Sequence, residues 1–295
     1  MKWYRKAAEQ GYATAQSNLG VCYYNGCGVE ENFEEAVKWY RKAAEQGNAY
    51  AQNNLGLCYD NGRGVEKSAE EAVKWYRKSA EQGYDAGECH LGQSLLLGIG
   101  VEKDEEAAVR YFHAAAEQKN EKAFAWLGYC FASGTGTTRN ENETAAWFAK
   151  LGNPADGFNE IAWGLFKAGR FSDALPFAER AVAAFRADES FPVHSRINIL
   201  DTLAAVLDAL GRAEETKSAC EEILALYSTD DMSRRRENAL VRLGRACQRL
   251  GDKAGAVDAY GKALAIVERH GGKHTEYGES ADSLRALLTE LSERS

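Results

Sequence analysis

The chain has 295 residues, of which 45% are hydrophobic and 27% are charged, a composition typical of a globular protein. Its formal net charge of −8 argues against non-specific binding to nucleic acid or to an anionic membrane, because such binding needs clustered lysines and arginines. No apolar run reaches the length of a transmembrane helix, and the chain contains only three prolines, which suits a helical protein.

The first half of the chain repeats itself every 36 residues. The segment WYRKAAEQG occurs at 3–11 and at 39–47, and it returns as WYRKSAEQG at 75–83. A leucine followed by a glycine, first seen at Leu19 and Gly20, recurs with the same spacing, and so does a G-x-G pair, first seen at Gly26 and Gly28. Such a period indicates stacked repeats, because one helix pair cannot bury its apolar face alone.

Each repeat is predicted to form two antiparallel helices joined by the G-x-G loop. The second helix starts at a residue whose side-chain oxygen can accept from free backbone N–H groups, which is Asn32, Ser68, Asp104 or Asn140. Ser68 and Glu71 match a full capping box. Gly47 and Gly83 are predicted to end this helix in the left-handed conformation, whereas Lys119 replaces the corresponding glycine.

Two further positions of the repeat carry structural expectations. Ala36, Trp39, Tyr40 and Ala43 form one apolar stripe of the second helix, so we expect the tryptophans at repeat positions to belong to the core. The first helix contains a glycine in every copy, such as Gly56. Because glycine costs up to about 1 kcal/mol against alanine in a helix, its return predicts that two backbones pack closely there.

The second half of the chain has a different period. After Pro154 the G-x-G loops vanish, and Gly169, Gly211 and Gly251 recur at spacings of 42 and 40 residues. A last apolar stripe follows the Gly271–Gly272 break, and solenoids need such a terminal helix with a polar outer face. We therefore expect one set of repeats over 1–152, a second set over 153–270 and a capping helix over 271–295.

The segment 51–83, AQNNLGLCYDNGRGVEKSAEEAVKWYRKSAEQG, resembles the Sel1-like repeat, a branch of the tetratricopeptide superfamily. The longer units of the second half resemble ordinary tetratricopeptide repeats. The resemblance implies an all-α fold, a right-handed α-solenoid superhelix of stacked antiparallel helix pairs, with about fourteen to sixteen helices and no sheet. It also implies a protein–protein interaction scaffold or adaptor, not an enzyme, that binds a partner peptide or domain along the concave solenoid surface.

In the tetratricopeptide family the first helix of each pair lines the concave surface. The resemblance therefore assigns groove residues by their distance from the repeated leucine, first seen at Leu19. They lie two positions before it, two after it, and five or six after it. These positions hold Asn53, Leu57, Asp60, Asn61, Cys89, Gln93, Tyr129, Asn159, Trp163, Lys167, Val241, Arg245, Gln248 and Arg249. Their amides could bond the backbone of an extended peptide, and Arg245 and Arg249 could hold an acidic residue or a C-terminal carboxylate. The expected partner is another protein with an extended, locally acidic segment.

The segment 233–251 contains six arginines, of which Arg242, Arg245 and Arg249 share one helix face, opposite Leu243 and Leu250. Three interpretations stay open. The arginines form a solvated face with local acidic partners, a site for an acidic peptide or carboxylate, or a nucleic-acid site, against which the net charge argues.

No motif for catalysis is present: there is no P-loop, no G-x-S-x-G and no H-E-x-x-H. We predict no catalytic residue, no metal site and no cofactor. His270 and His274 lie in a glycine-rich break and are predicted to be solvated rather than to bind a metal. The seven cysteines, an odd number without a C-x-x-C pair, are predicted to be small buried apolar side chains.

Free thiols favour a reducing compartment, so we expect a cytoplasmic protein. Met1 falls in the middle of a second-type helix, so we expect the chain to be a fragment or to have a misassigned start, and a missing N-terminal signal segment would make it exported. Two alternative functions are an exported regulatory or host-interaction repeat protein, because Sel1-like arrays also occur outside bacterial cytoplasms, and a hydrolase, for which no nucleophile–base pair is seen.

Overall fold

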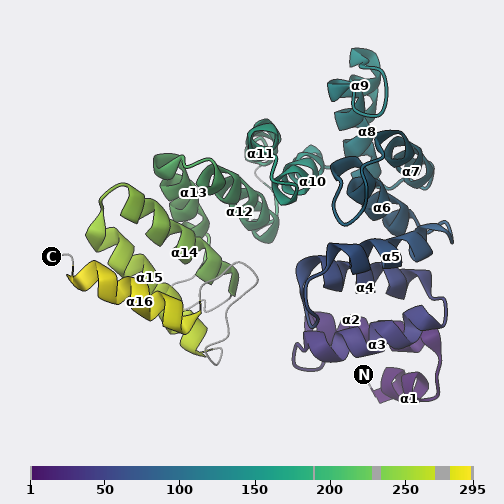
Figure 1. Cartoon of the computed structure of the whole chain (residues 1–295), viewed down its shortest axis with the longest axis horizontal. Helices are drawn as coiled ribbons and strands as arrows, with labels where there is room; N and C mark the ends of the chain where they lie inside the picture. Colours follow the sequence, from purple (N-terminus) through teal and green to yellow (C-terminus); the bar gives the residue numbers. More distant parts are fainter. Residues whose placement is uncertain (1, 189, 228–233, 270–279, 294–295) are drawn as a thin grey trace. The chain divides into compact units, whose positions relative to one another are not determined.

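The structure, a computed structural model, describes residues 2–188, 190–227, 234–269 and 280–293. Within these residues the chain forms sixteen α-helices and no strand, which confirms the predicted all-α fold (Figure 1). The helices belong to two compact units, Met1–Gly152 (unit 1) and Asn153–Ser295 (unit 2). Each unit is a stack of antiparallel helix pairs.

Unit 1 alternates between two kinds of helix, as the repeat period predicts. The first helices of its repeats are α2 (Ala13–Asn25), α4 (Ala49–Asn61), α6 (Asp85–Leu97) and α8 (Glu121–Ser133). The second helices are α1 (Lys2–Glu9), α3 (Phe33–Glu45), α5 (Ala69–Ala80), α7 (Glu105–Glu117) and α9 (Glu141–Phe148). Each first helix packs on the second helices before and after it, so neighbouring pairs share one core.

The four predicted N-caps of unit 1 are confirmed. The side-chain oxygens of Asn32, Ser68, Asp104 and Asn140 each accept from the backbone N–H three residues later. The backbone N–H of Ser68 itself donates to the carbonyl of Tyr59 on the preceding helix, at 3.0 Å. Glu71 pairs with Lys74 at 2.5 Å, so the reciprocal half of the predicted capping box is replaced by other contacts.

The left-handed conformation predicted after α3 and α5 is confirmed. Gly47 and Gly83 have φ angles of 89° and 71°. Lys119 occupies the same position with φ of 66°, the one non-glycine residue with positive φ in the part of the chain that the structure describes. Because a Cβ is crowded in this region, Lys119 carries backbone strain that its glycine counterparts avoid.

The glycine in the middle of each first helix accommodates an aromatic ring from the following helix. A Cβ on Gly56 would lie 2.6 Å from Cε1 of Tyr76, whereas the nearest backbone atom, the carbonyl oxygen of Ala72, would be 3.2 Å away. Rings occupy the equivalent place at Gly20 and Gly92. The predicted close approach is therefore confirmed in part, because it is chiefly a ring, and not a second backbone, that excludes a side chain here.

The second glycine of the G-x-G loop joins neighbouring repeats. A Cβ on Gly64 would overlap the backbone carbonyl of Phe33, the first residue of α3. Gly100 and Gly136 stand in the same relation to the first residues of α5 and α7. Gly64 also has φ of 71°, so both its conformation and its contact require glycine. The loop thus positions each repeat on the one before it.

A buried amide also connects successive repeats of unit 1. Gln52 on α4 donates through Nε2 to the carbonyl of Ala44 at 3.0 Å, and its Oε1 accepts from Nε2 of Gln82 at 2.7 Å. Gln16 makes the same two bonds one repeat earlier. This buried position needs a side chain that both donates and accepts, which a glutamine amide provides.

The tryptophans at repeat positions lie at the rim of the core. Trp39 and Trp75 are half-buried, and the ammonium groups of Lys42 and Lys78 lie 4.3 Å and 4.1 Å from their ring centres. Trp3, on α1, is 78% exposed. The expectation that these tryptophans belong to the core is confirmed in part: Trp39 and Trp75 pack against the core from its edge, whereas Trp3 does not. The fully buried aromatic side chains are those of the next residues, Tyr40, Tyr76 and Phe112.

Unit 2 consists of helix pairs followed by a last helix. Its first helices are α10 (Pro154–Lys167), α12 (Val193–Ala209) and α14 (Arg234–Arg249). Its second helices are α11 (Phe171–Arg186), α13 (Ala213–Ala225) and α15 (Lys253–Arg269), and α16 (Ala281–Glu293) packs on α15.

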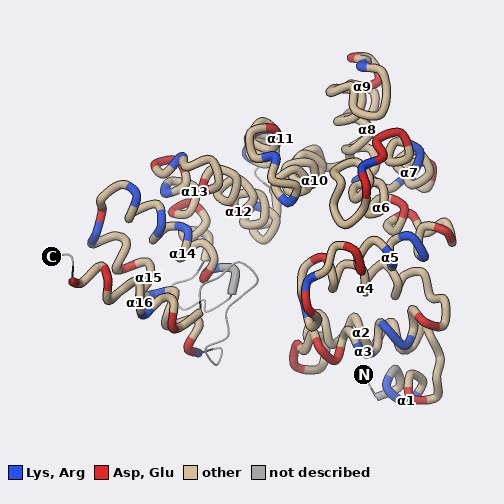
Figure 2. The backbone as a smooth tube through the Cα atoms, in the orientation of Figure 1, with Lys and Arg blue, Asp and Glu red and all other residues tan. Residues whose placement is uncertain are grey.

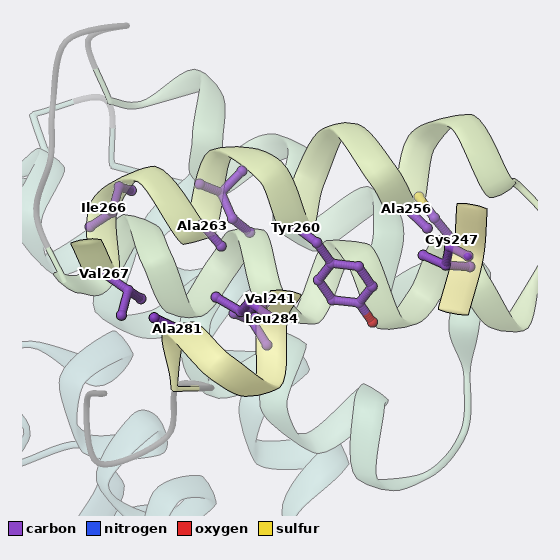
Figure 3. Close-up of a cluster of buried hydrophobic side chains, with 11 residues drawn as sticks. Val241, Cys247, Ala256, Tyr260, Ala263, Ile266, Val267, Ala281 and Leu284 are labelled. Carbon is purple, nitrogen blue, oxygen red and sulfur yellow. The ribbon is translucent and has the colours of Figure 1, made fainter. Parts of the chain in front are cut away.

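The core of unit 2 repeats the glycine–ring contact of unit 1. A Cβ on Gly244 of α14 would lie 2.5 Å from Cε1 of Tyr260 on α15. Figure 3 shows Tyr260 in the buried cluster that also contains Val241, Ala263 and Leu284. Leu284 comes from α16, so the last helix covers the apolar side of α15.

Candidate functional site

The first helices of successive pairs lie against one another in both units. In unit 1, α4 contacts α6 and α6 contacts α8, and in unit 2, α10 contacts α12 and α12 contacts α14. Successive second helices make fewer contacts, so the first helices lie on the inside of each stack. We call the surface of α4, α6 and α8 the inner face of unit 1, and that of α10, α12 and α14 the inner face of unit 2.

The inner face of unit 1 is mainly polar where it is accessible. The predicted groove residues that are half-buried there are Leu57, Asp60, Asn61 and Gln93. Asn53 and Tyr129 are only 4% exposed, so both belong to the packed interior rather than to an open surface. Oδ1 of Asn53 lies 2.7 Å from Nδ1 of His90, which ties α4 to α6. A surface-bound partner could contact little of either buried side chain.

The inner face of unit 2 begins with an aromatic pair on α10. Trp163 stacks on Phe166, with ring centres 5.3 Å apart and an angle of 18° between the planes, and both side chains are half-buried. Lys167 lies one residue further, also half-buried. The side-chain oxygen of Asn159 is buried and has no hydrogen-bond partner within the described residues.

The predicted arginine face of α14 meets two aspartates of α12. Arg242 is 7% exposed and forms an ion pair with Asp201. Burial by itself would lower the pKa of Arg242, but Asp201 beside it raises that pKa above its ordinary value, so the guanidinium stays charged. Arg249 donates to Oδ1 and to the carbonyl of Asp208, at 2.5 Å and 3.2 Å, and Arg245 lies 4.0 Å from Oδ2.

These contacts support the interpretation that the arginines have local acidic partners, with one correction. Arg242 is buried, so it does not belong to a solvated face, whereas Arg249 is exposed and Arg245 is half-buried. Gln248 is exposed and accepts from the hydroxyl of Tyr260 at 3.2 Å. Blue segments along α14 mark the arginines in Figure 2.

Sequence reasoning missed Asp201 and Asp208, although a signal for them was present. Counting back eight residues from Gly169, Gly211 and Gly251 gives Ile161, Leu203 and Leu243. Asp201 lies two residues before Leu203, and Asp208 lies five residues after it. In the other repeats these same two positions hold predicted groove residues. The middle repeat of unit 2 therefore supplies the acidic part of the inner face.

All seven cysteines are free thiols, and five of them are buried as predicted. The prediction is wrong for Cys22, which is half-buried, and for Cys27, which is exposed. Burial raises the pKa of the Cys58, Cys130 and Cys220 thiols to about 12, so these three are not thiolate nucleophiles at neutral pH.

Among the described residues, no group of three His, Cys, Asp or Glu side chains is arranged to hold a metal ion. His270 and His274 lie outside these residues, so their predicted solvation stays a prediction. Nor does any helix in the described ranges combine the length and the apolar character that crossing a membrane requires.

A large open hollow lies at the loops of unit 1. It has a volume of about 890 Å³ and lies between the loop before α7 and residues 136–138. Its lining is mainly charged and includes Arg77, Glu102, Asp104 and Glu106. Figure 2 shows this acidic stretch leading into α7. Small-molecule pockets are usually enclosed and apolar, so this hollow does not have their character.

Stacked antiparallel helix pairs of this kind define the class of α-solenoid repeat proteins. The Sel1 repeat family model matches residues 1–12, 13–48, 49–84, 86–120 and 121–152. The chain therefore belongs to the Sel1 repeat family, as its 36-residue motif predicts. Folds of this class are typical of protein–protein interaction scaffolds, and the families are generally non-catalytic. No curated protein matches the chain.

Three solved structures show what the chain is similar to. A Sel1 repeat protein from Oxalobacter formigenes is 30% identical, with a TM-score of 0.51 over 75% of this chain and 88% of that one. The protein c5321, a protective antigen of uropathogenic Escherichia coli with an SLR fold, is 29% identical, with a TM-score of 0.50 over 90% and 64%. Yeast Tom70 shares the fold at 14% identity, with a TM-score of 0.56 over 99% and 58%.

Proposed function

We propose that the chain is a protein–protein interaction scaffold and that the inner face of unit 2 binds an extended segment of a partner protein. The observation that carries the proposal is the combination on this face of a half-buried aromatic pair on α10 with a set of arginines on α14. Aromatic side chains and arginine are the residues that contribute most to protein–protein binding.

The charge of this face favours an acidic segment. Arg242, Arg245 and Arg249 carry three positive charges, and Asp201 and Asp208 carry two negative charges, so the five side chains have a net charge of +1. The whole chain has a net charge of −8, so a preference for an acidic segment has to come from local positive charge such as this. A carboxylate of the partner could join Asp208 in bonding Arg249 and Arg245 through charge-assisted hydrogen bonds.

The inner face of unit 1 offers a second surface of different character. Its accessible groove residues carry amide, carboxylate and aliphatic groups, as in Asn61, Asp60 and Leu57. Amide side chains can bond the backbone of an extended segment with little regard for its sequence. We assign this face a supporting role and expect the charge preference to come from unit 2.

Affinity capture from a lysate of the source organism tests the proposal. The wild-type chain is compared with Arg245→Glu/Arg249→Glu and with a charge-matched control, Lys262→Glu/Arg269→Glu, on the exposed surface of α15. We expect specific partners to be lost with the first variant and retained with the control. If every captured partner survives the charge reversal at 245 and 249, unit 2 does not bind through this face. Circular dichroism melts check that both variants are folded.

A cytoplasmic location fits the seven free cysteines, because thiols persist in a reducing compartment. The alternative, an exported regulatory or host-interaction protein, gains support from the similarity to c5321, which is a protective antigen in uropathogenic strains. Fractionation of source cells, followed by detection of the chain in cytosolic and extracellular fractions, decides between the two locations.

A further inference from the structure

One position of the repeat in unit 1 changes its chemistry between copies. Gln16 and Gln52 occupy it in two repeats, and each donates to a carbonyl of the preceding second helix while it accepts from a glutamine amide of the following one. In the next copy, 36 residues further, the residue is Glu88 at the start of α6. A carboxylate can accept the bond from the following glutamine, but it has no proton to donate to the carbonyl of the preceding helix.

Glu88 is as buried as its glutamine counterparts, with 7% of its surface exposed. Its Oε2 accepts from Nε2 of Gln118 at 3.0 Å, which reproduces the bond that Gln82 makes to Gln52. In the preceding repeat, Gln52 also donates a hydrogen bond to the carbonyl of Ala44. Glu88 can donate the equivalent bond only when its carboxyl group carries a proton. Only the protonated side chain can therefore reproduce the contacts of the repeat.

The surroundings of Glu88 disfavour its ionised form. The charged groups that act on it are Asp85, on its own helix, and Glu117, on α7, and both are acidic. Gln118 favours the carboxylate by hydrogen bonding, but burial, with Asp85 and Glu117, outweighs it and raises the pKa of Glu88 above its ordinary value. Beside Glu88, Gly87 stands where the other repeats have Ala15, Ala51 and Ala123, and a Cβ on it would lie 2.5 Å from Oγ of Ser79, so α6 packs closely on α5 here.

We propose that Glu88 is a proton-sensitive joint, which holds α6 firmly to the adjacent repeats when protonated and loosens this contact when ionised. The direction follows from linkage. A carboxyl that binds its proton more tightly in the folded state contributes full stability below its unfolded pKa. That contribution is lost as pH rises through the interval up to the folded pKa. Because α6 carries Gln93 on the inner face of unit 1, pH thereby controls the rigidity of that face.

Hydrogen exchange of the α6 amides in the full chain tests this joint. Wild type is compared with Glu88→Gln, which restores the residue of the sibling repeats, at a series of pH values from about 4 to about 8. Comparison at equal pH cancels the intrinsic pH dependence of exchange. We expect equal protection of α6 at the acidic end. Towards neutral pH the variant should become better protected, by about tenfold for each unit by which the folded pKa exceeds the unfolded one.

Two further variants make the test specific to the proposed chemistry. Gln52→Glu should introduce the same loss of protection with rising pH into α4, because it recreates the joint one repeat earlier. Asp85→Asn keeps an oxygen for the bond from Asn120 but removes a negative charge, so the midpoint of the wild-type transition should move to lower pH. A protection ratio between Glu88→Gln and wild type that stays constant over the whole pH series would overturn the proposal.

Discussion

Replacing Gly56 with alanine sets two physical effects of opposite sign against each other. Alanine is a better helix former than glycine by about 1 kcal/mol, so propensity alone predicts a more stable protein. The structure predicts the reverse, because the new Cβ would lie 2.6 Å and 2.7 Å from two ring carbons of Tyr76. Carbon atoms in contact prefer about 3.5–4.0 Å, so the ring would have to retreat by roughly 1 Å.

The ring of Tyr76 has little room to retreat, because this residue is 3% exposed. Overpacking of such a core costs about 1–3 kcal/mol, which exceeds the gain in propensity. We expect Gly56→Ala to lower the free energy of unfolding by a net amount of about 1 kcal/mol. Gly56→Leu should cost more, about 3 kcal/mol. Asn61→Ala, at the half-buried end of α4, should cost less than either, about 0.5 kcal/mol.

The assay is urea unfolding followed by far-UV circular dichroism and by tryptophan fluorescence. Five of the six tryptophans lie in unit 1, so fluorescence reports chiefly on the unit that carries Gly56. Gly261→Ala is the matched control, because Gly261 lies within helix α15 and a Cβ added there would meet no atom within 4 Å. The control should be stabilised. If Gly56→Ala is also more stable than wild type, the ring contact does not explain the repeated glycine.

Two other substitutions test separate parts of the structure. Lys119→Gly should raise the free energy of unfolding by about 1 kcal/mol in the same urea assay, because it relieves the positive φ of 66°; an unchanged midpoint would show that Lys119 is not strained. Arg242→Leu should lower it by about 2 kcal/mol, because Asp201 loses its buried partner but keeps some contact with water. Adding Asp201→Asn to Arg242→Leu should recover part of that loss, and a fully additive second loss would contradict the pairing.

The local chemistry of unit 1 could be predicted well from its sequence. Asn32, Ser68, Asp104 and Asn140 act as N-caps because a side-chain oxygen at this point bonds an N–H three residues away. The all-α fold follows from the same signals, since a fixed period and repeated caps leave few alternatives. These features depend on residues that are close in the chain.

What the sequence could not predict depends on contacts between helices. A glycine repeated in every copy indicates a close approach, but the partner of Gly56 is a ring 20 residues later, which periodicity does not identify. Asn53 and Tyr129 occupy groove positions by counting, yet the packing of α4, α6 and α8 buries them. Asp208 pairs with Arg249 because α12 packs against α14, and this contact between helices cannot be deduced from the spacing of residues in the sequence.

Site-specific photocrosslinking in source cells tests the proposed binding surface most directly. A photoreactive amino acid replaces Gln248, which is exposed on the inner face of unit 2, or Lys262, which is exposed on α15. Scaffold function through the inner face predicts that position 248 forms a discrete adduct with a partner protein and that position 262 does not. A partner that crosslinks to position 262 and not to position 248 would contradict the account, because the partner would then bind the second helices.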